Sequence, residues 1–550
     1  MSVSQYLSDV VKPAAHGAAD AARGKARDAA DRAREAADKA SASLQGFIDE
    51  YRDRLHQLFN ARLDPDRLAL QRGLPPFALK EVRGNAVITE DPLAAYIPSE
   101  YGGRGARMHE SLAVLEQTGY ESLPLCLMVG INGGLFLHPV AKYGHESIKK
   151  EVFSRFLDGK SMGGLMITEP EYGSDALHMK TSHDQTERGT YKIKGVKHWG
   201  GLTGWADFWL LTAREKTASG NLSRDIDFFL CDVTKPGQHI EVEEIFPNLG
   251  LYMIPYGRNR IDVEVPQAHR LQPQTTGIKM LLDVLNRSRL QFPGMGMGFL
   301  RRMRDEAVLH SRERQVGGKS LESYDQVQAR LARLQASATA CAAMCAFTSE
   351  NGGLDKDVSG MGLAANSAKT VVTDMMHEAA QSLLQLVGAK GYRQDHIAGR
   401  SITDSRPFQI FEGSNDILYQ QVAESVIKQM RRLKETNLYT YLTAEPLTER
   451  ASDYFKDVLD FKVDAALPQR KLVQLGEIVS RVVSMEMTIE IGERGYRSDL
   501  VKQSLDSFRA DVGTMVAGLR QELMPNVIED YNAGSDWLPF VNTAPTLAQS

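Results

Sequence analysis

A block of short β-favouring segments lies between two long stretches of helical periodicity, and this order limits the folds available to the chain. The segments 191–196, 208–212 and 226–231 are rich in apolar and aromatic residues, and 260–265 alternates strictly between polar and apolar positions. Because helices do not alternate with these strands, the pattern argues against a doubly wound nucleotide-binding sheet. It predicts a multidomain α+β protein.

The two helical stretches divide the chain further. After Pro266 the sequence predicts long helices over 278–289, 298–315, 324–349, 364–386 and 417–434, which favours a helix bundle. A linker is expected over 439–450. The expected domains are an alanine-rich helical extension (1–44), an N-terminal helical domain (45–160), a central β-barrel-like domain (161–275), a C-terminal four-helix bundle (276–438) and an additional helical extension (445–535).

The alanine-rich extension has a heptad pattern. Alternating steps of four and three residues connect Ala22, Ala26, Ala29, Ala33, Ala36 and Ala40. Alanine propagates a helix well but buries little surface. A coiled-coil arm, a helix packed on its own protein and a frayed extension therefore stay open.

Composition narrows the class of protein. The 550 residues include 65 basic and 70 acidic side chains, a net charge of -5 that is typical of soluble globular proteins and does not suggest nucleic acid. The four cysteines are too few for a disulfide framework, and the histidines show no metal-ligand spacing. With no signal-like N-terminus and no run of about 20 apolar residues, we expect a cytoplasmic protein. Peripheral contact with the inner membrane stays open.

Two polar stretches are candidates for function. Glu412 lies between an apolar run and a helix-start signal at Ser414 and Asn415. Considered alone, it is most simply an acidic residue that favours the positive end of the following helix. The stretch 167–175 combines a hydroxyl group, small residues and turn-forming positions, which suit either a polar ligand or an ordinary strand-to-turn junction.

Five motifs occur in the order typical of one family. They are Met166-Ile167-Thr168-Glu169-Pro170, Gly173-Ser174-Asp175, Gly195-Val196-Lys197-His198-Trp199, Gln385-Leu386-Val387-Gly388-Ala389-Lys390-Gly391-Tyr392 and Phe411-Glu412-Gly413-Ser414. Over residues of about 85 to 430 the chain resembles the acyl-CoA dehydrogenase family. The N-terminal alanine-rich stretch and the C-terminal helices mark a divergent member.

The resemblance implies a flavoenzyme of fatty acid β-oxidation. FAD would be bound by Ile167, Thr168, Gly173, Ser174, Trp199, Gly201, Arg314, Gln385, Gly388, Ala389 and Ser414. The acyl-CoA substrate would be bound by Ser174, Arg289, Glu412 and Gly413, although Arg287 competes with Arg289 for the position near CoA. Arg314 would reach the cofactor of a neighbouring subunit, so the smallest competent unit would be a homodimer.

Glu412 matches the family's catalytic base. It would remove the α-proton of the thioester while the β-hydride passes to flavin N5, and electrons would leave through an electron-transfer flavoprotein. One departure concerns the flavin N5 contact, because either Gly201 offers its N–H or Thr203 offers its hydroxyl group. An acyl-CoA oxidase or flavin monooxygenase on the same fold, and a non-catalytic flavoprotein binding partner, are the alternatives.

Overall fold

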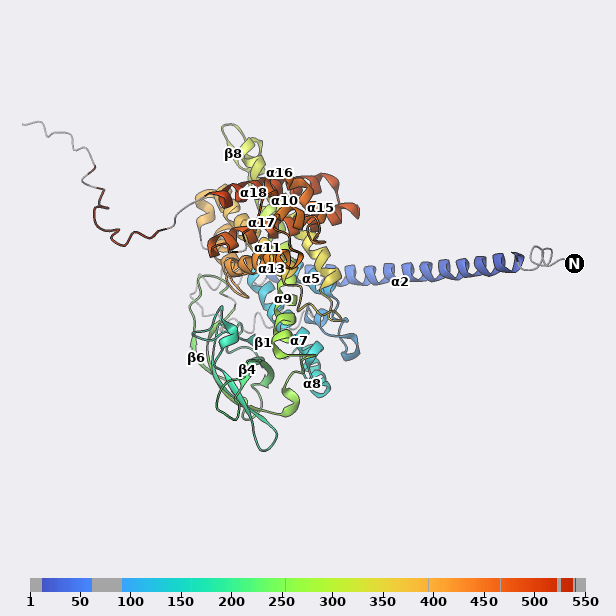
Figure 1. The fold of residues 1–550 in the computed structure, drawn as a ribbon. Helices are drawn as coiled ribbons and strands as arrows, with labels where there is room; N and C mark the ends of the chain where they lie inside the picture. Colours follow the sequence, from blue (N-terminus) through green and yellow to red (C-terminus); the bar gives the residue numbers. More distant parts are fainter. Residues whose placement is uncertain are drawn as a thin grey trace, which may run out of the picture.

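The computed structural model describes residues 12–61, 92–521 except 160, 253, 394 and 465, 526–537 and 540, with side chains in the first range described from 30 to 57. Figure 1 shows a helical region at one end and a sheet at the other, with α9 running between them. Helices of the N-terminal part lie beside the sheet. The short helical turns are η4 (Pro92–Tyr96), η5 (Ser99–Tyr101), η7 (Ala176–His178), η8 (Gln267–His269), η9 (Leu321–Ser323), η10 (Gly388–Tyr392), η11 (Arg406–Gln409) and η12 (Asp453–Phe455).

The N-terminal helices form an apolar core beside the sheet. They are α5 (Met108–Glu121), α6 (Leu123–Gly130), the π-helical η6 (Ile131–Leu137), α7 (His138–Tyr143) and α8 (Glu146–Leu157). The stretch Leu123–Tyr143 is long and apolar enough to cross a membrane, but 94% of its most apolar window is buried inside the protein. Such burial is usual for a core helix, so this stretch is weak evidence for a membrane span.

A curled seven-stranded sheet follows in the described chain. Its strands are β1 (Gly163–Met166), β2 (Ser182–Gln185), β3 (Tyr191–His198), β4 (Phe208–Glu215), β5 (Asp227–Asp232), β6 (Glu241–Ile245) and β7 (Gly257–Val265). The order is β1-β4-β2-β3-β7-β6, with β5 paired to β4. The predicted segments are confirmed as β3, β4, β5 and β7. The polar strands β2 and β6 carry no apolar alternation that would have predicted them.

Helix α9 (Gly277–Glu313) corrects the expectation of two helices over 278–289 and 298–315, because it continues through Pro293. Its glycines are sites of close packing. A Cβ on Gly298 would lie 2.0 Å from the main-chain oxygen of Glu116, and one on Gly296 would lie 2.3 Å from Val372. Tertiary packing on both sides therefore stabilises a segment whose local propensity favours a break.

The remaining helices form the large helical region of Figure 1. They are α10 (Asp325–Asn351), α11 (Gly362–Val387), α12 (Ile397–Ser405), α13 (Asn415–Leu433), α14 (Leu438–Leu442), α15 (Glu449–Ser452), α16 (Lys456–Leu459), α17 (Gln469–Glu493) and α18 (Ser498–Arg520). A hairpin of β8 (Gln315–Val316) and β9 (Lys319–Ser320) follows α9. Over 439–450, where a linker was expected, the chain forms the end of α14 and the start of α15, and Tyr441, Leu442 and Thr448 are buried.

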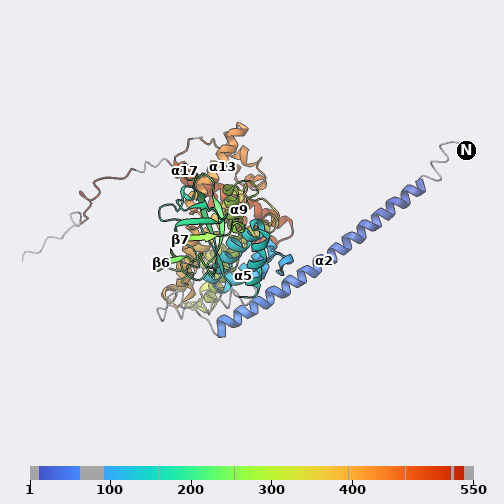
Figure 2. The same ribbon diagram turned by 90° about the horizontal axis from the view of Figure 1, so that it is seen from below.

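Helix α2 (Lys12–Ala61) projects from the body in both ribbon views (Figures 1 and 2). The side chains from 30 to 43 are exposed, whereas Ile48, Tyr51 and Leu55 are buried against the body. One continuous helix therefore crosses the domain boundary expected at residue 44.

Candidate active site

Glu412 lies in the turn between η11 and α13, with its backbone in the left-handed region at φ 55°. This conformation is uncommon for a residue with a side chain and needs support from its surroundings. Arg289 of α9 gives such support, because its Nε donates to the main-chain oxygen of Glu412 at 3.0 Å. Gly413 follows at φ 94°, where a Cβ would lie 2.8 Å from Leu418. The turn is therefore closely packed.

The two oxygens of the Glu412 carboxylate have different environments. Oε1 accepts a hydrogen bond from Ser288 Oγ at 3.0 Å. Oε2 is buried and has no hydrogen-bond partner among the described residues. Burial raises the pKa of Glu412, and the opposing effects of Ser288, Arg289 and Lys369 do not reverse this shift. The carboxylate is thus a stronger proton acceptor than an exposed glutamate, with one oxygen unpaired.

Lys369 of α11 is a charged residue near this turn that the motifs did not indicate. It is fully buried, and its Nζ donates to the main-chain oxygen of Gly413 and to Oδ1 of Asn415, both at 2.9 Å. Burial lowers the pKa of Lys369 to about 7. The sequence did contain a signal for this residue, because Lys369 is a single lysine among the apolar and small residues of its helix. A buried lysine needs hydrogen-bond or charged partners, so such a position indicates a polar site nearby.

The sheet presents an aromatic surface at the end of β3. Trp199 directly follows this strand, is 55% exposed and has a left-handed backbone at φ 57°. Its ring centroid lies 4.6 Å from that of Phe246. The N–H of His198 donates to the main-chain oxygen of Thr168 at 2.8 Å, so the stretch after β1 runs beside the end of β3. Ile167, Thr168 and Trp199 consequently share one edge.

A buried ion pair supports that edge. Lys197 Nζ donates to Glu169 Oε1 and to the main-chain oxygen of Ile167, both at 3.0 Å. Glu169 in turn accepts the main-chain N–H groups of Lys180 and Thr181. Both residues lay in the quoted motifs without a role assigned to them. Their contacts show that they hold the main chain of the candidate flavin surface.

The hydroxyl group of Thr203 is used inside the protein. It donates to the main-chain oxygen of Gly200 at 2.7 Å and accepts from Asn259 Nδ2 at 3.0 Å, and Thr203 is fully buried. Of the two alternatives for the flavin N5 contact, this geometry favours the main chain of Gly201.

Tyr256 connects the sheet edge to the base. Its ring centroid lies 6.1 Å from that of Trp199, and a Cβ on Gly201 would lie 3.4 Å from its Cε1. The same Cβ would lie 2.6 Å from Ile131, which explains the glycine. Burial first, and then the charge of Glu412, raises the pKa of Tyr256. The charge of Glu412 thus acts on Tyr256, which packs beside the sheet edge and which no sequence pattern indicated.

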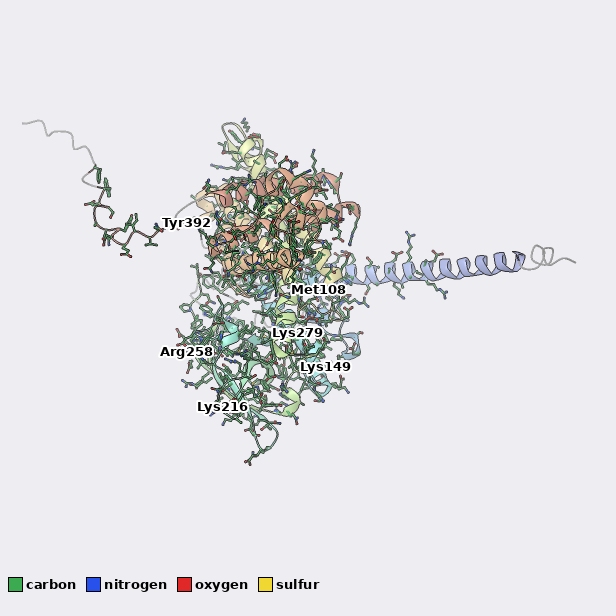
Figure 3. The ribbon with its side chains drawn as sticks, viewed as in Figure 1. Met108, Lys149, Lys216, Arg258, Lys279 and Tyr392 are labelled. Carbon is green, nitrogen blue, oxygen red and sulfur yellow. The ribbon has the colours of Figure 1, made fainter. Side chains whose placement is uncertain are left out.

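A second group of predicted residues lies at the other end of α9. Arg314 follows the last residue of this helix, where its N–H donates to the main-chain oxygen of His310. Burial lowers the pKa of His310, the main chain of Leu386 opposes this shift, and the nearby charges of Lys390 and Arg314 lower the pKa further. Tyr392 at the end of η10 is 84% exposed (Figure 3).

The predicted site residues thus form two groups. The first group comprises the base turn and the sheet edge, with Ser414 as N-cap of α13; its members are Ile167, Thr168, Trp199, Gly201, Arg289, Glu412 and Gly413. The second group lies near the far end of α9 and comprises Arg314, Gln385, Gly388 and Ala389. Arg289 and Glu313 are 24 residues apart in one helix, which at about 1.5 Å per residue is roughly 36 Å. Gly173 and Ser174 lie on the exposed loop between β1 and η7.

Comparison with known proteins identifies the class to which this fold and site belong. The acyl-CoA dehydrogenase N-terminal, middle and C-terminal domain models match residues 49–160, 164–263 and 275–427 in that order. The chain is an oxidoreductase of the FAD-dependent flavoprotein class. It belongs to the acyl-CoA dehydrogenase family, which confirms the resemblance and the fold class expected from the sequence.

The relatives are distant. The chain is 25% identical over 328 residues to the acyl-CoA dehydrogenase of Bacillus subtilis, covering 58% of this chain and 83% of that relative. It is 24% identical over 354 residues to the mouse very long-chain specific acyl-CoA dehydrogenase, covering 63% of this chain and 53% of the relative. The solved acyl-CoA dehydrogenase of Bacillus anthracis complexed with FAD has a TM-score of 0.71 at 17% identity, covering 86% and 88% of the two chains, and shows the shared fold.

Proposed function

We propose that the protein removes hydrogen from the α and β carbons of an acyl-CoA thioester, giving the trans-2-enoyl-CoA, with Glu412 as the base. The observation that carries this proposal is the buried Oε2 of Glu412, which has no hydrogen-bond partner among the described residues while Oε1 is held by Ser288. A base needs an oxygen that is free to receive a proton, and the raised pKa of Glu412 strengthens it for that purpose.

The turn that carries Glu412 also offers a hydrogen-bond donor for the carbonyl oxygen of the substrate. An α-proton beside a thioester is weakly acidic, so its removal requires a hydrogen-bond donor at the carbonyl oxygen. We place that oxygen against the main-chain N–H of Glu412, whose position is held by the bond from Arg289. Arg287, by contrast, donates to Asp283 at 2.8 Å and to the main-chain oxygen of Gly352. Both arginines are therefore occupied by contacts within the protein.

The first group of residues fits FAD. Trp199 offers an exposed flat ring, and Ile167, Thr168 and Gly201 offer a tightly packed main chain on the same edge. When bound, FAD would supply the acceptor for the hydride of the β-carbon. Gly173, Ser174 and Ser414 are proposed to contact the polar parts of the cofactor, and Ser174 and Gly413 to contact the substrate as well.

The second group fits a neighbouring copy of the chain. Arg314 and the small, exposed Gly388 and Ala389 suit the oxygens of a pyrophosphate, and the exposed Gln385 lies just before them in the last turn of α11. Their separation from Glu412 along α9 argues that they serve the cofactor of a second subunit. We therefore propose a homodimer as the smallest active unit, with an electron-transfer flavoprotein as the electron acceptor.

An anaerobic titration tests this function. The purified yellow protein is mixed with acyl-CoAs of increasing chain length, and the flavin absorbance should be bleached by a subset of them. Glu412→Gln should still bind acyl-CoA but should not be bleached. The exposed Glu424→Gln on α13 is the matched control. Persistent bleaching in the Glu412→Gln variant would refute the base assignment.

Oxygen separates the alternative activities. After bleaching, the reduced protein is mixed with air-saturated buffer and the return of the flavin absorbance is followed. Slow return is expected for a dehydrogenase that passes electrons to a protein acceptor. Rapid return would instead favour an acyl-CoA oxidase or a flavin monooxygenase on the same fold.

A further inference from the structure

Helix α17, beyond the matched family domains, lies directly on the helix that begins after the base turn. Where α17 crosses α13, Gly476 allows close contact, because a Cβ there would lie 1.9 Å from the main-chain oxygen of Tyr419. Five residues later, Arg481 points into the bundle and is only 8% exposed. A charged side chain from the C-terminal helices is thus enclosed by the main helical region.

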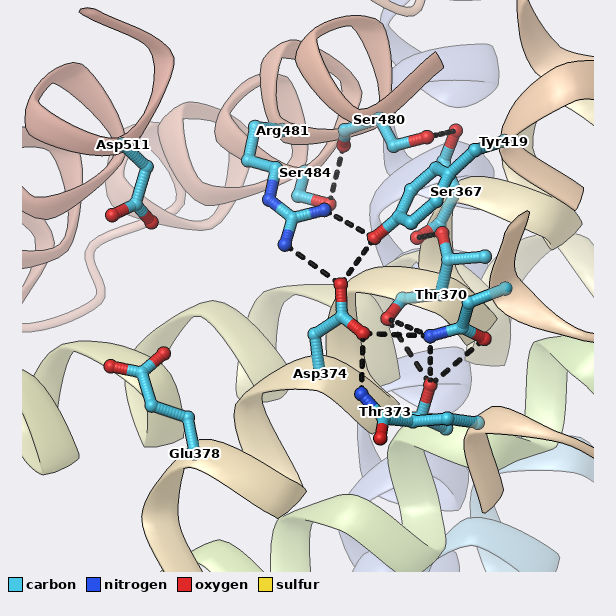
Figure 4. Close-up of polar contacts among 12 residues, drawn as sticks. Ser367, Thr370, Thr373, Asp374, Glu378, Tyr419, Ser480, Arg481, Ser484 and Asp511 are labelled. Atoms are coloured by element: carbon cyan, nitrogen blue, oxygen red, sulfur yellow. Dashed lines mark hydrogen bonds and ion pairs between the residues drawn. The ribbon is translucent and has the colours of Figure 1, made fainter. Parts of the chain in front are cut away.

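Arg481 meets Asp374 of α11 in a network of polar contacts (Figure 4). Its Nη2 donates to Asp374 Oδ2 at 2.9 Å, and its Nη1 donates to the hydroxyl oxygen of Tyr419. The Tyr419 hydroxyl donates in turn to the same Oδ2 of Asp374. One oxygen of Asp374 is therefore occupied by the side of the network that faces α17 and α13.

The other oxygen of Asp374 holds both ends of the base turn. Oδ1 accepts from Gln409 Nε2 at 2.8 Å and from Asn415 Nδ2 at 2.7 Å. Gln409 lies three residues before Glu412 and Asn415 three residues after it. The strained turn is thus bracketed by two bonds to a single carboxylate.

The charge of Asp374 is maintained by Arg481. Burial alone would raise the pKa of Asp374, but Arg481, the Tyr419 hydroxyl and Gln409 hold this pKa below its ordinary value. Asp374 is partly buried and accepts from four donors, and without Arg481 it would lose the only cation bonded to it among the described residues. Its position, and with it the two bonds to the turn, would then be less well defined.

We propose that Arg481 is a positioning residue for the proposed base: through Asp374 it holds the Gln409-to-Asn415 turn in the conformation that presents Glu412. The helices after residue 445 would then be part of the active-site structure. The catalytic consequence rests on the proposed function, but the effect on the turn does not. The side-chain bonds of Arg481 run to Asp374 and Tyr419, so it acts on the turn through Asp374.

Two variants, one within α17 and one at the residue that caps its C-terminus, separate this role from simple attachment of the C-terminal helices. Arg481→Met removes the bond to Asp374. Arg494→Met is the matched control. Arg494 also connects this end of α17 to the main bundle, because its side chain bonds to Glu350 of α10, but it makes no bond to Asp374 or to residues 409–415 among the described residues. Arg481→Lys restores the positive charge and should recover part of any loss.

Hydrogen exchange measured by mass spectrometry reports on the turn without requiring activity. In Arg481→Met, peptides covering 409–415 should exchange at least about tenfold faster than in the original protein, whereas Arg494→Met should leave them unchanged. Anaerobic flavin reduction by acyl-CoA should slow by about tenfold to hundredfold in Arg481→Met, with little change in the KM for acyl-CoA. Arg481→Lys should lie between.

Unchanged exchange in 409–415 would overturn the proposal, whatever the activity. If the original protein is not reduced by any acyl-CoA, the proposed function fails, while the exchange result still decides the role of Arg481. Should Arg481→Met not fold, Gln409→Leu removes one arm of the bracket without touching α17. The same acceleration of exchange is expected in that variant, and its absence would equally count against the proposal.

Discussion

Replacing Lys369 by methionine should shift the pH dependence of flavin reduction. Glu412 acts as a base only when deprotonated, so the rate falls as the pH drops below its pKa. Lys369 lowers this pKa from within the protein, and because the pKa of Lys369 is about 7, it carries its charge throughout the acidic range. Removing that charge should raise the pKa of Glu412 and move the acid limb of the profile to higher pH.

The size of the shift follows from the contacts. An opposite charge within about 4–6 Å typically changes a carboxylate pKa by roughly 1–3 units, and Lys369 bonds to the residue next to Glu412. Lys369 Nζ bonds to the main-chain oxygen of Gly413 and not to the carboxylate itself, and Ser288 and Arg289 lower the pKa of Glu412 as well, so the lower end of this range applies. We therefore expect a shift of about one pH unit, which is about a tenfold slower reduction on the acid limb and no change well above neutral pH.

Stopped-flow reduction under anaerobic conditions, over about pH 5 to pH 9, measures this profile. Lys428→Met, an exposed position on α13, is the control and should leave the profile unchanged. The variant also removes a donor from the main-chain oxygen of Gly413, at a cost of about 1–3 kcal/mol, so its thermal unfolding is recorded in parallel. An acid limb that stays in place or moves to lower pH, in a folded variant, would refute the reasoning.

Two further substitutions probe the sheet edge. Gly201→Ala would place a methyl group 2.6 Å from Ile131. We therefore expect the purified variant to contain less FAD and to lose about 1–3 kcal/mol in unfolding free energy. A normal FAD content would contradict the tight packing. Lys197→Met leaves Glu169 buried without its cation and should cost about 3–5 kcal/mol in urea unfolding. Glu169→Gln should recover much of that loss in the double variant, and a double variant as unstable as Lys197→Met would show that the ion pair is not the cause.

Local sequence patterns were sufficient where a single segment carries its own signal. The alternation in 260–265 predicted β7, because each side chain in a strand faces the opposite side from its neighbour. They failed at Pro293, where contacts with α5 and α11 stabilise a helix that the local sequence would interrupt. They also did not indicate the short helices over 439–450, where the burial of Tyr441 and Leu442 and the hydrogen bond from Thr448 Oγ1 to the main-chain oxygen of Leu442 order the chain.

The sequence by itself determined that a sheet region lies between two helical regions, and it determined the family. It also determined the residue types available at the site, including an acid at 412 and a tryptophan at 199. Only the tertiary structure decided how these residues act together. It placed Lys369 and Ser288 beside Glu412, separated Arg314 from the base by the length of α9, and brought Arg481 to Asp374. Burial and charge compensation depend on residues far apart in the chain, so local spacing does not reveal them.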